Sequence, residues 1–142
     1  MELVVLDASV ATKWLVVEPD SAVANDLLTD SVQLTAPAIV RVEVAGAILR
    51  RHRMGVMEQQ DARAACERWN DLLDERFVRL IEEDEVYGLA LDLALRTKHP
   101  LPDCLYLAAA MMLDCRLLTA DQILRERGLA VNPRIDLLAR AA

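Results

Sequence analysis

Four short, largely apolar segments, separated by residues with helical character, are the feature that most constrains the fold of this chain. They are residues 3–6 (LVVL), 32–37 (VQLTAP), 77–81 (FVRLI) and 115–119 (CRLLT). Short apolar runs without polar alternation are typical of strands that are buried on both faces of a parallel sheet. Helices between such strands cover both faces of the sheet. We therefore expect a three-layer α/β/α fold with a central, mostly parallel sheet of four to five strands.

The segments between the predicted strands favour helix. We expect helices over approximately 9–16, 21–29, 39–53, 58–76, 84–98, 103–113 and 121–127. Residues 99–102 (HPLP) are expected to form a rigid, non-helical link, because proline fixes φ and lacks an amide donor. The tail after Gly128 fits either a last edge strand or a helix, and Pro133 argues against a central strand.

Length and composition indicate one globular domain over residues 1–142, because the chain is too short for two comfortable domains. The longest apolar run, residues 105–113, is well under the roughly 18 residues needed to span a bilayer. The N-terminus has an acidic residue where a signal peptide would carry a basic one. We therefore expect a soluble, cytoplasmic protein without a membrane partner. The three cysteines include no CxxC pair and are expected to be free thiols.

The formal net charge of −7 argues against a protein that binds nucleic acid simply by being basic. If the chain acts on nucleic acid, something must neutralise the repulsion locally, and a divalent cation is one candidate.

Four carboxylates stand out because of their positions. Asp7 directly follows the first predicted strand, and Asp121 lies two residues after the fourth. Ligands of open parallel sheets bind beyond the carboxyl ends of the strands. Glu43 interrupts an otherwise apolar helix start, and Asp103 opens an almost wholly apolar helix. Each acid therefore lies at the start of a helix or within its first turns.

Three of these acids also have an ordinary structural explanation. Asp7 is a plausible cap of the helix that follows it. Thr119 and Gln122 match a capping box around Asp121. Asp103 in a first turn is favoured by the helix dipole alone.

Glu43 is harder to explain in this way. Val40, Val44 and Ala47 share its helix face at spacings of three and four residues. A carboxylate against apolar surface is costly unless it is paired, so we expect Arg41, a lysine or a metal beside it.

The four acids and their surroundings resemble the PIN-domain ribonuclease family, and within it the VapC-type toxins of bacterial toxin–antitoxin pairs. The segments that carry the resemblance are LDAS, AP followed by VEVAGAIL, LPDCLYLAAAMML and CRLLTADQIL. The resemblance extends from Leu3 to about Gly128, with the acids in the order of the family.

This resemblance implies a PIN-like fold whose acids converge at the carboxyl edge of the sheet. Asp7, Glu43, Asp103 and Asp121 would be catalytic and would bind Mg²⁺ or Mn²⁺, with Ser9 and Thr119 in supporting positions. The implied reaction is hydrolysis of RNA phosphodiesters by a metal-activated water, leaving a 3′-hydroxyl and a 5′-phosphate. The implied partners are an RNA substrate, a cognate antitoxin and a second copy of the chain.

A basic cluster at the end of the Glu43 helix consists of Arg50, Arg51, His52 and Arg53. It fits a solvated helix C-terminus, where cations are favoured. It also fits a phosphate-guiding surface for RNA or a contact with an acidic antitoxin segment. Arg41 is a further candidate for phosphate contact.

Three functional hypotheses follow. The first is a metal-dependent endoribonuclease that acts as the toxin of a toxin–antitoxin pair. The second is a non-catalytic, protein-binding α/β module in which the acids are caps. The third is a PIN-domain nuclease of RNA processing outside a toxin–antitoxin system.

Overall fold

The computed structural model describes residues 1–29, 31–132 and 134–138 of the chain. Five strands form one sheet in the order β3-β2-β1-β4-β5, and every pair of neighbours is parallel. The strands are β1 (Glu2–Leu6), β2 (Val32–Pro37), β3 (Val78–Ile81), β4 (Arg116–Thr119) and β5 (Ile135–Leu137). The prediction of a central parallel sheet is therefore confirmed. The tail supplies an edge strand, β5, and Pro133 lies outside the described residues.

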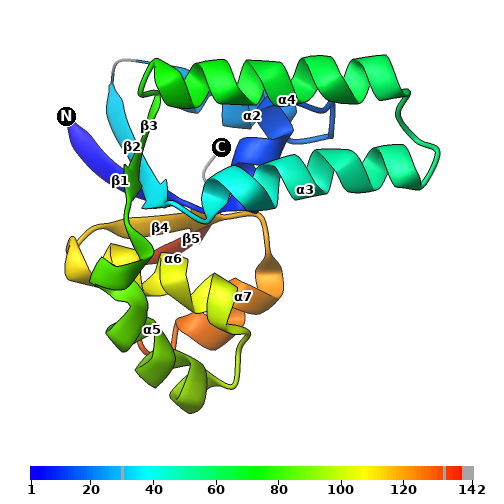
Figure 1. The fold of residues 1–142 in the computed structure, drawn as a ribbon. Coiled ribbons are helices and arrows are strands. Elements are labelled where there is room, and N and C mark those ends of the chain that lie inside the picture. Colours follow the sequence, from blue (N-terminus) through cyan, green and yellow to red (C-terminus); the bar gives the residue numbers. More distant parts are fainter. Residues whose placement is uncertain (30, 133, 139–142) are drawn as a thin grey trace.

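Seven α-helices are found in the described part of the chain. They are α1 (Ala8–Ala11), α2 (Ser21–Asn25), α3 (Val40–Arg53), α4 (Gln59–Asp74), α5 (Glu83–Thr97), α6 (Leu101–Met112) and α7 (Gln122–Gly128). Helices α2, α3 and α4 lie on one side of the sheet, and α5, α6 and α7 lie on the other (Figure 1). The three-layer α/β/α architecture is thus confirmed. No helix among the described residues is long and apolar enough to cross a membrane.

Helices α3 and α4 run alongside each other and project from the sheet, and we call this pair the α3–α4 arm (Figure 1). The chain turns back at the tip of the arm, where Gly55 has φ of +76°. A positive φ is readily adopted by glycine because it has no Cβ. The base of the arm is held by buried Trp69 of α4, whose Nε1 donates to the carbonyl of Arg41 at 3.1 Å.

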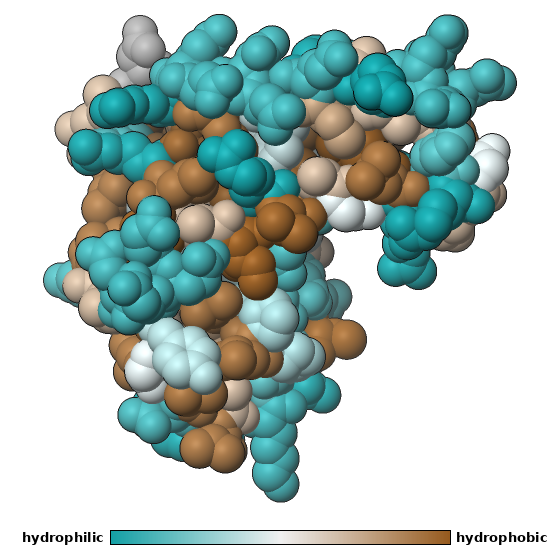
Figure 2. Space-filling model, in the orientation of Figure 1, coloured by the Kyte–Doolittle hydropathy of each residue, from teal (hydrophilic) through white to brown (hydrophobic). Residues whose placement is uncertain are grey.

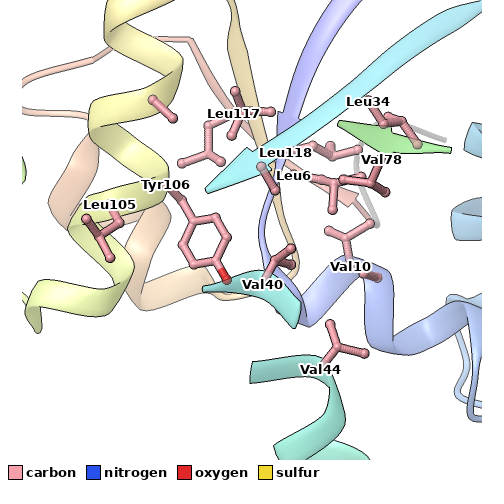
Figure 3. Close-up of a cluster of buried hydrophobic side chains, with 14 of the residues drawn as sticks. Leu6, Val10, Leu34, Val40, Val44, Val78, Leu105, Tyr106, Leu117 and Leu118 are labelled. Carbon is pink, nitrogen blue, oxygen red and sulfur yellow. The ribbon is translucent and has the colours of Figure 1, made fainter. Parts of the chain in front are cut away.

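The core consists of strand residues that pack against helices from both layers (Figure 3). Leu6 of β1 and Leu118 of β4 are fully buried and adjacent in register. Val44 of α3 lies in one helical layer and Tyr106 of α6 in the other, and both are buried. This packing fixes how the first turns of α3 and α6 approach the carboxyl ends of β1 and β4.

Three predicted helix boundaries were wrong. The helix expected over 9–16 is α1 followed by a 3₁₀ turn, Thr12–Trp14, and the one expected over 21–29 is α2 followed by a 3₁₀ turn, Asp26–Leu28. The segment HPLP is not wholly non-helical, because α6 already begins at Leu101. Proline is tolerated there because the first turn of a helix has no intrahelical acceptor for its amide groups.

Candidate active site

Asp7 lies where β1 ends and is almost fully buried, with 5% of its surface exposed. Its Oδ1 accepts hydrogen bonds from the backbone N–H of Ser9 at 3.1 Å and of Val10 at 3.4 Å, so Asp7 is the N-cap of α1. Its Oδ2 accepts a 2.5 Å hydrogen bond from the hydroxyl of Thr119 at the end of β4. One carboxylate therefore caps a helix and also joins two neighbouring strands.

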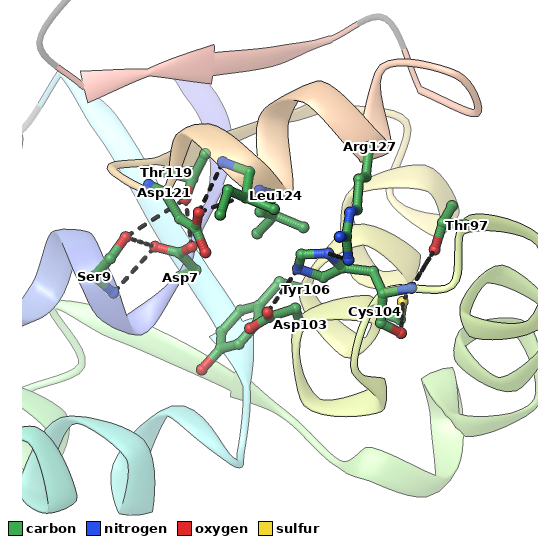
Figure 4. Close-up of polar contacts among 12 residues, drawn as sticks. Asp7, Ser9, Thr97, Asp103, Cys104, Tyr106, Thr119, Asp121, Leu124 and Arg127 are labelled. Carbon is green, nitrogen blue, oxygen red and sulfur yellow. Dashed lines mark hydrogen bonds and ion pairs between the residues drawn. The ribbon is translucent and has the colours of Figure 1, made fainter.

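Ser9 and Thr119 hold the Asp7 carboxylate from both sides (Figure 4). The Ser9 hydroxyl donates to Asp7 Oδ1 at 2.5 Å and accepts from the backbone N–H of Ala120 at 2.9 Å. The Thr119 hydroxyl also accepts from the backbone N–H of Asp121 at 3.0 Å. Asp7, not Ser9, is thus the cap of α1, while both hydroxyls support Asp7.

Asp121 is the N-cap of α7, and the expected capping box of Thr119 and Gln122 is wrong. Asp121 Oδ1 accepts from the backbone N–H of Ile123 at 2.9 Å and of Leu124 at 3.2 Å. Gln122 instead donates from Nε2 to Glu126. The reason is that Thr119 is the last residue of β4, two positions before the residue that caps α7.

Glu43 lies in the first turn of α3, and among the described residues its side-chain partner is a tyrosine rather than the expected arginine or lysine. The Tyr106 hydroxyl of α6 donates to Glu43 Oε1 at 2.5 Å. Burial and the neighbouring Glu43 carboxylate raise the pKa of Tyr106 well above its usual range, so the hydroxyl keeps its proton and acts as a donor.

Asp103, in the first turn of α6, is the common electrostatic neighbour of the other three acids. Burial raises the pKa of Glu43, the Tyr106 hydrogen bond opposes that rise, and the Asp103 charge adds to it. For Asp103 itself, burial raises the pKa, while His99 lowers it and the charge of Asp121 raises it. The structure thus brings all four sequence-predicted acids into one electrostatic cluster.

The pKa of Asp7 is strongly raised. Burial raises its pKa from 3.8 to about 6, against the opposing hydrogen bonds of Ser9 and Thr119, and the Asp103 charge contributes further. Asp7 is the buried member of the cluster, while Glu43, Asp103 and Asp121 are partly exposed. The cluster is accessible to solvent from that side.

His99 joins this cluster and was missed in the sequence. Its Nε2 lies 2.7 Å from Oδ2 of Asp103. Potential ligand atoms of His99, Asp103 and Asp121 all lie within 4.8 Å of one another. The position of His99 four residues before Asp103 was the available signal, but the intervening prolines made a shared helical face hard to infer.

This donor set fits a hard divalent cation. Carboxylate oxygens are the ligands that Mg²⁺ and Mn²⁺ prefer. Without a cation, burial and then repulsion between the crowded carboxylates favour retained protons, which agrees with the raised pKa values of Asp7, Glu43 and Asp103.

Three of the predicted arginines line a single hollow. This hollow, of 650 Å³, is lined by Glu43 together with Arg50, Arg51 and Arg53. The outline of the molecule is concave between the α3–α4 arm and the helices of the opposite layer (Figure 2). Arg51 is also a structural residue, since its Nη2 lies 2.8 Å from Oε1 of Glu18.

The fourth predicted arginine, Arg41, is exposed and does not line the hollow. Among the described residues its guanidinium has no hydrogen-bond or ion-pair partner, whereas its backbone N–H donates to the Ala38 carbonyl and its own carbonyl accepts from Trp69. The structure therefore separates Arg41 from the other three arginines.

The fold is shared with two solved structures. A toxin–antitoxin complex from Klebsiella pneumoniae contains a chain that is 16% identical, with a TM-score of 0.61, and the match covers 95% of this chain and 97% of that one. PAE2754 from Pyrobaculum aerophilum is 17% identical, with a TM-score of 0.64, covering 99% of this chain and 86% of that one. No curated protein sequence matches the chain.

The PIN domain family model matches residues 4–128, which include all four acids, Ser9, Thr119 and His99. PIN domains are generally nucleases that use divalent metals, which supports a hydrolase activity. The match covers most of the sequence and agrees with the observed sheet and helix order. The chain belongs to the PIN domain family.

Proposed function

We propose that this protein is a Mg²⁺- or Mn²⁺-dependent endoribonuclease that acts as the toxin of a toxin–antitoxin pair. The observation that carries the proposal is the convergence of Asp7, Glu43, Asp103 and Asp121 on one solvent-accessible edge of the sheet. The structural likeness to a chain of the Klebsiella toxin–antitoxin complex supports the toxin assignment.

In this proposal the four carboxylates hold the cation, and Ser9 and Thr119 hold Asp7 in place. The bound cation supplies an activated water and stabilises charge on the phosphodiester. Glu43 and Asp121 approach the cluster from different helices, so the site forms only when α3 and α7 are both docked.

With a net charge of −7, the protein as a whole repels RNA. The arginines provide a local positive charge that attracts it. Arg50, Arg51 and Arg53 line the hollow that also contains Glu43. A phosphate backbone held by these arginines would therefore run toward the acidic cluster. Arg41, which is exposed on the first turn of α3, is proposed as a weaker contact.

The catalytic part of the proposal is tested by RNA cleavage with the purified chain. We expect cleavage with Mg²⁺ or Mn²⁺, none with EDTA, and none in Asp7→Asn or Asp103→Asn. Asp92→Asn, an exposed acid on α5, is the matched control and should retain activity. Cleavage that persists in EDTA or in both site variants would exclude the metal mechanism.

The toxin part is tested in a bacterial host. Induction of the chain should arrest growth, and induction of Asp103→Asn should not. A small protein encoded beside the chain should relieve the arrest when it is co-expressed. RNA cleavage without growth arrest would instead favour a PIN-domain nuclease of RNA processing. Absence of both cleavage and Mn²⁺ binding would favour a non-catalytic, protein-binding module.

The remaining parts of the proposal concern the state of the protein in the cell. We propose a single PIN domain over residues 1–142, acting in the cytoplasm as a homodimer that also binds its antitoxin. Light scattering of the purified chain tests the dimer, with a mass twice the 15.8 kDa of one chain expected.

A further inference from the structure

His99 lies in the short link between α5 and α6 and is held from several directions. Its side chain is buried, and the residue is 6% exposed. Its backbone N–H donates to the Thr97 hydroxyl at 3.3 Å, and its carbonyl accepts from the Cys104 thiol at 3.7 Å. These contacts fix the backbone from which the imidazole reaches Asp103.

The imidazole has one defined tautomer in this arrangement. Nη1 of Arg127 lies 3.4 Å from His99 Nδ1, and Nε2 lies 2.7 Å from Asp103 Oδ2. A guanidinium can only donate hydrogen bonds, so Nδ1 is the acceptor and the ring proton lies on Nε2. Nε2 therefore donates to the Asp103 carboxylate.

We propose that His99 is a positioning residue, which holds Asp103 by its Nε2–H so that the other carboxylate oxygen, Oδ1, is presented to the cation. This inference rests on the proposed function. In the described part of the chain, Oδ2 of Asp103 is hydrogen-bonded to a side chain, that of His99, and Oδ1 to none. Hydrogen bonds of this kind fix the orientation of metal-binding side chains.

Arg127 links this arrangement to Asp121, another partly exposed acid of the same edge. Asp121 caps the N-terminus of α7, and Arg127 lies in the last turn of the same helix. Through His99, which contacts both Arg127 and Asp103, the C-terminal end of α7 supports the first turn of α6. The two helices that carry Asp103 and Asp121 are thereby coupled by side chains.

A direct ligand role for His99 is the competing possibility, because its ring lies within 4.8 Å of Asp103 and Asp121 oxygens. The geometry favours positioning, since a protonated Nε2 has no lone pair for a metal. The two roles differ in metal preference as well, because imidazole ligands favour Zn²⁺, Fe²⁺ and Ni²⁺ over Mg²⁺.

The test measures Mn²⁺ affinity by electron paramagnetic resonance, with folding checked by circular dichroism in EDTA. We expect His99→Ala to weaken Mn²⁺ binding by about tenfold to a hundredfold. His99→Gln should restore most of the affinity, because its amide can donate to Asp103. His52→Gln is the matched control, since His52 lies at the end of α3 and contacts the Met57 carbonyl. Unchanged affinity in His99→Ala, or an equal loss in His99→Gln, would overturn the proposal.

Two further measurements keep the proposal testable if His99→Ala does not fold. Arg127→Gln changes an exposed residue and should weaken Mn²⁺ binding severalfold, and no weakening would count against the proposal. In the unaltered protein, electron spin-echo spectra of bound Mn²⁺ should show no directly coordinated nitrogen. A directly coordinated nitrogen would make His99 a ligand and overturn the positioning role. Failure of the unaltered protein to bind Mn²⁺ would instead refute the proposed function itself.

Discussion

The Tyr106 hydroxyl donates a 2.5 Å hydrogen bond to Oε1 of Glu43, across 63 positions of sequence and between two helical layers. Tyr106 is 1% exposed and lies three residues after Asp103 on α6. One helix therefore carries an acid of the cluster and also the donor that holds another acid. This contact offsets part of the penalty that burial places on ionised Glu43.

Tyr106→Phe should therefore disturb Glu43 without removing any carboxylate. The pKa of Glu43 should rise further, because burial is then no longer opposed by this hydrogen bond. We expect weaker Mn²⁺ binding at pH 7 and a free energy of unfolding lower by about 1–2 kcal/mol in EDTA. Calorimetry measures the first quantity and urea denaturation the second. Tyr87→Phe, on the exposed face of α5, should change neither, and equal effects of the two variants would contradict this account.

Asp7 should make the metal-free protein less stable as the pH rises. Its pKa is about 6 in the folded chain and 3.8 for the ordinary group, so the folded state binds more protons than the unfolded state between these values. The contribution of Asp7 to stability is therefore greatest below pH 4 and falls by about 3 kcal/mol as the pH rises through 6. Glu43 and Asp103, whose pKa values are also raised, act in the same direction.

Urea denaturation in EDTA at several pH values between 4 and 7.5 measures this dependence. Asp7→Asn should flatten it, because the titrating group is gone, whereas Asp92→Asn should leave the slope unchanged. Mn²⁺ at a hundred times its Kd should add about 2.7 kcal/mol near pH 7. A slope that is the same in Asp7→Asn and in the unaltered chain would show that Asp7 does not titrate in this range.

The acids could be predicted from the sequence because their positions depend on local features. Asp7 and Asp121 follow strands, and parallel strands bring their carboxyl ends to one edge whatever the details of packing. Glu43 stood out because it interrupts an apolar helix start, and Asp103 because it opens an almost wholly apolar helix. The sheet order and the edge strand at 135–137 needed the structure, since the tail pattern fits helix and strand alike.

The partners of the acids could not be predicted in the same way. Tyr106 in an apolar helix looks like an ordinary core residue, and only the docking of α6 against α3 brings its hydroxyl to Glu43. The capping box at Thr119 failed for a similar reason, because pairing with β5 keeps Thr119 in β4, and Asp121, two residues later, caps α7. Long-range contacts of this kind override local capping patterns.

The arginines of the hollow should contribute to RNA affinity through charge. In an Asp103→Asn background, which is expected to prevent cleavage, Arg50→Gln and Arg53→Gln should each weaken binding of single-stranded RNA. Each lost phosphate contact should also reduce the slope of log K against log salt by about 0.7. Filter binding across a salt series measures both effects.

Arg96→Gln is the matched control, because Arg96 is exposed on α5, in the opposite helical layer. Arg51→Gln should combine reduced affinity with a small loss of stability, about 0–1 kcal/mol, since it breaks the partly exposed pair with Glu18. Salt slopes that are unaltered in both Arg50→Gln and Arg53→Gln would exclude the hollow as the RNA path.

Gly128 should be required for the packing of β5 against α7. A Cβ at this position would overlap Cδ1 of Ile135 and lie 3.5 Å from Cδ1 of Leu107. Gly128→Ala should therefore lower the free energy of unfolding by about 1–3 kcal/mol. Gly88→Ala is the matched control, since a Cβ there meets nothing within 4 Å and should stabilise α5 by about 0.5–1 kcal/mol.

A double variant identifies the steric cause of the Gly128 effect. Ile135→Val removes the Cδ1 atom that the new Cβ would overlap, at an expected cost of about 0.5–1.5 kcal/mol on its own. In the presence of Gly128→Ala this cost should vanish or change sign, because the shorter side chain makes room for the methyl group. Urea denaturation of the four proteins measures the coupling. Additive losses would show that Gly128 matters for its backbone rather than for its contact with β5.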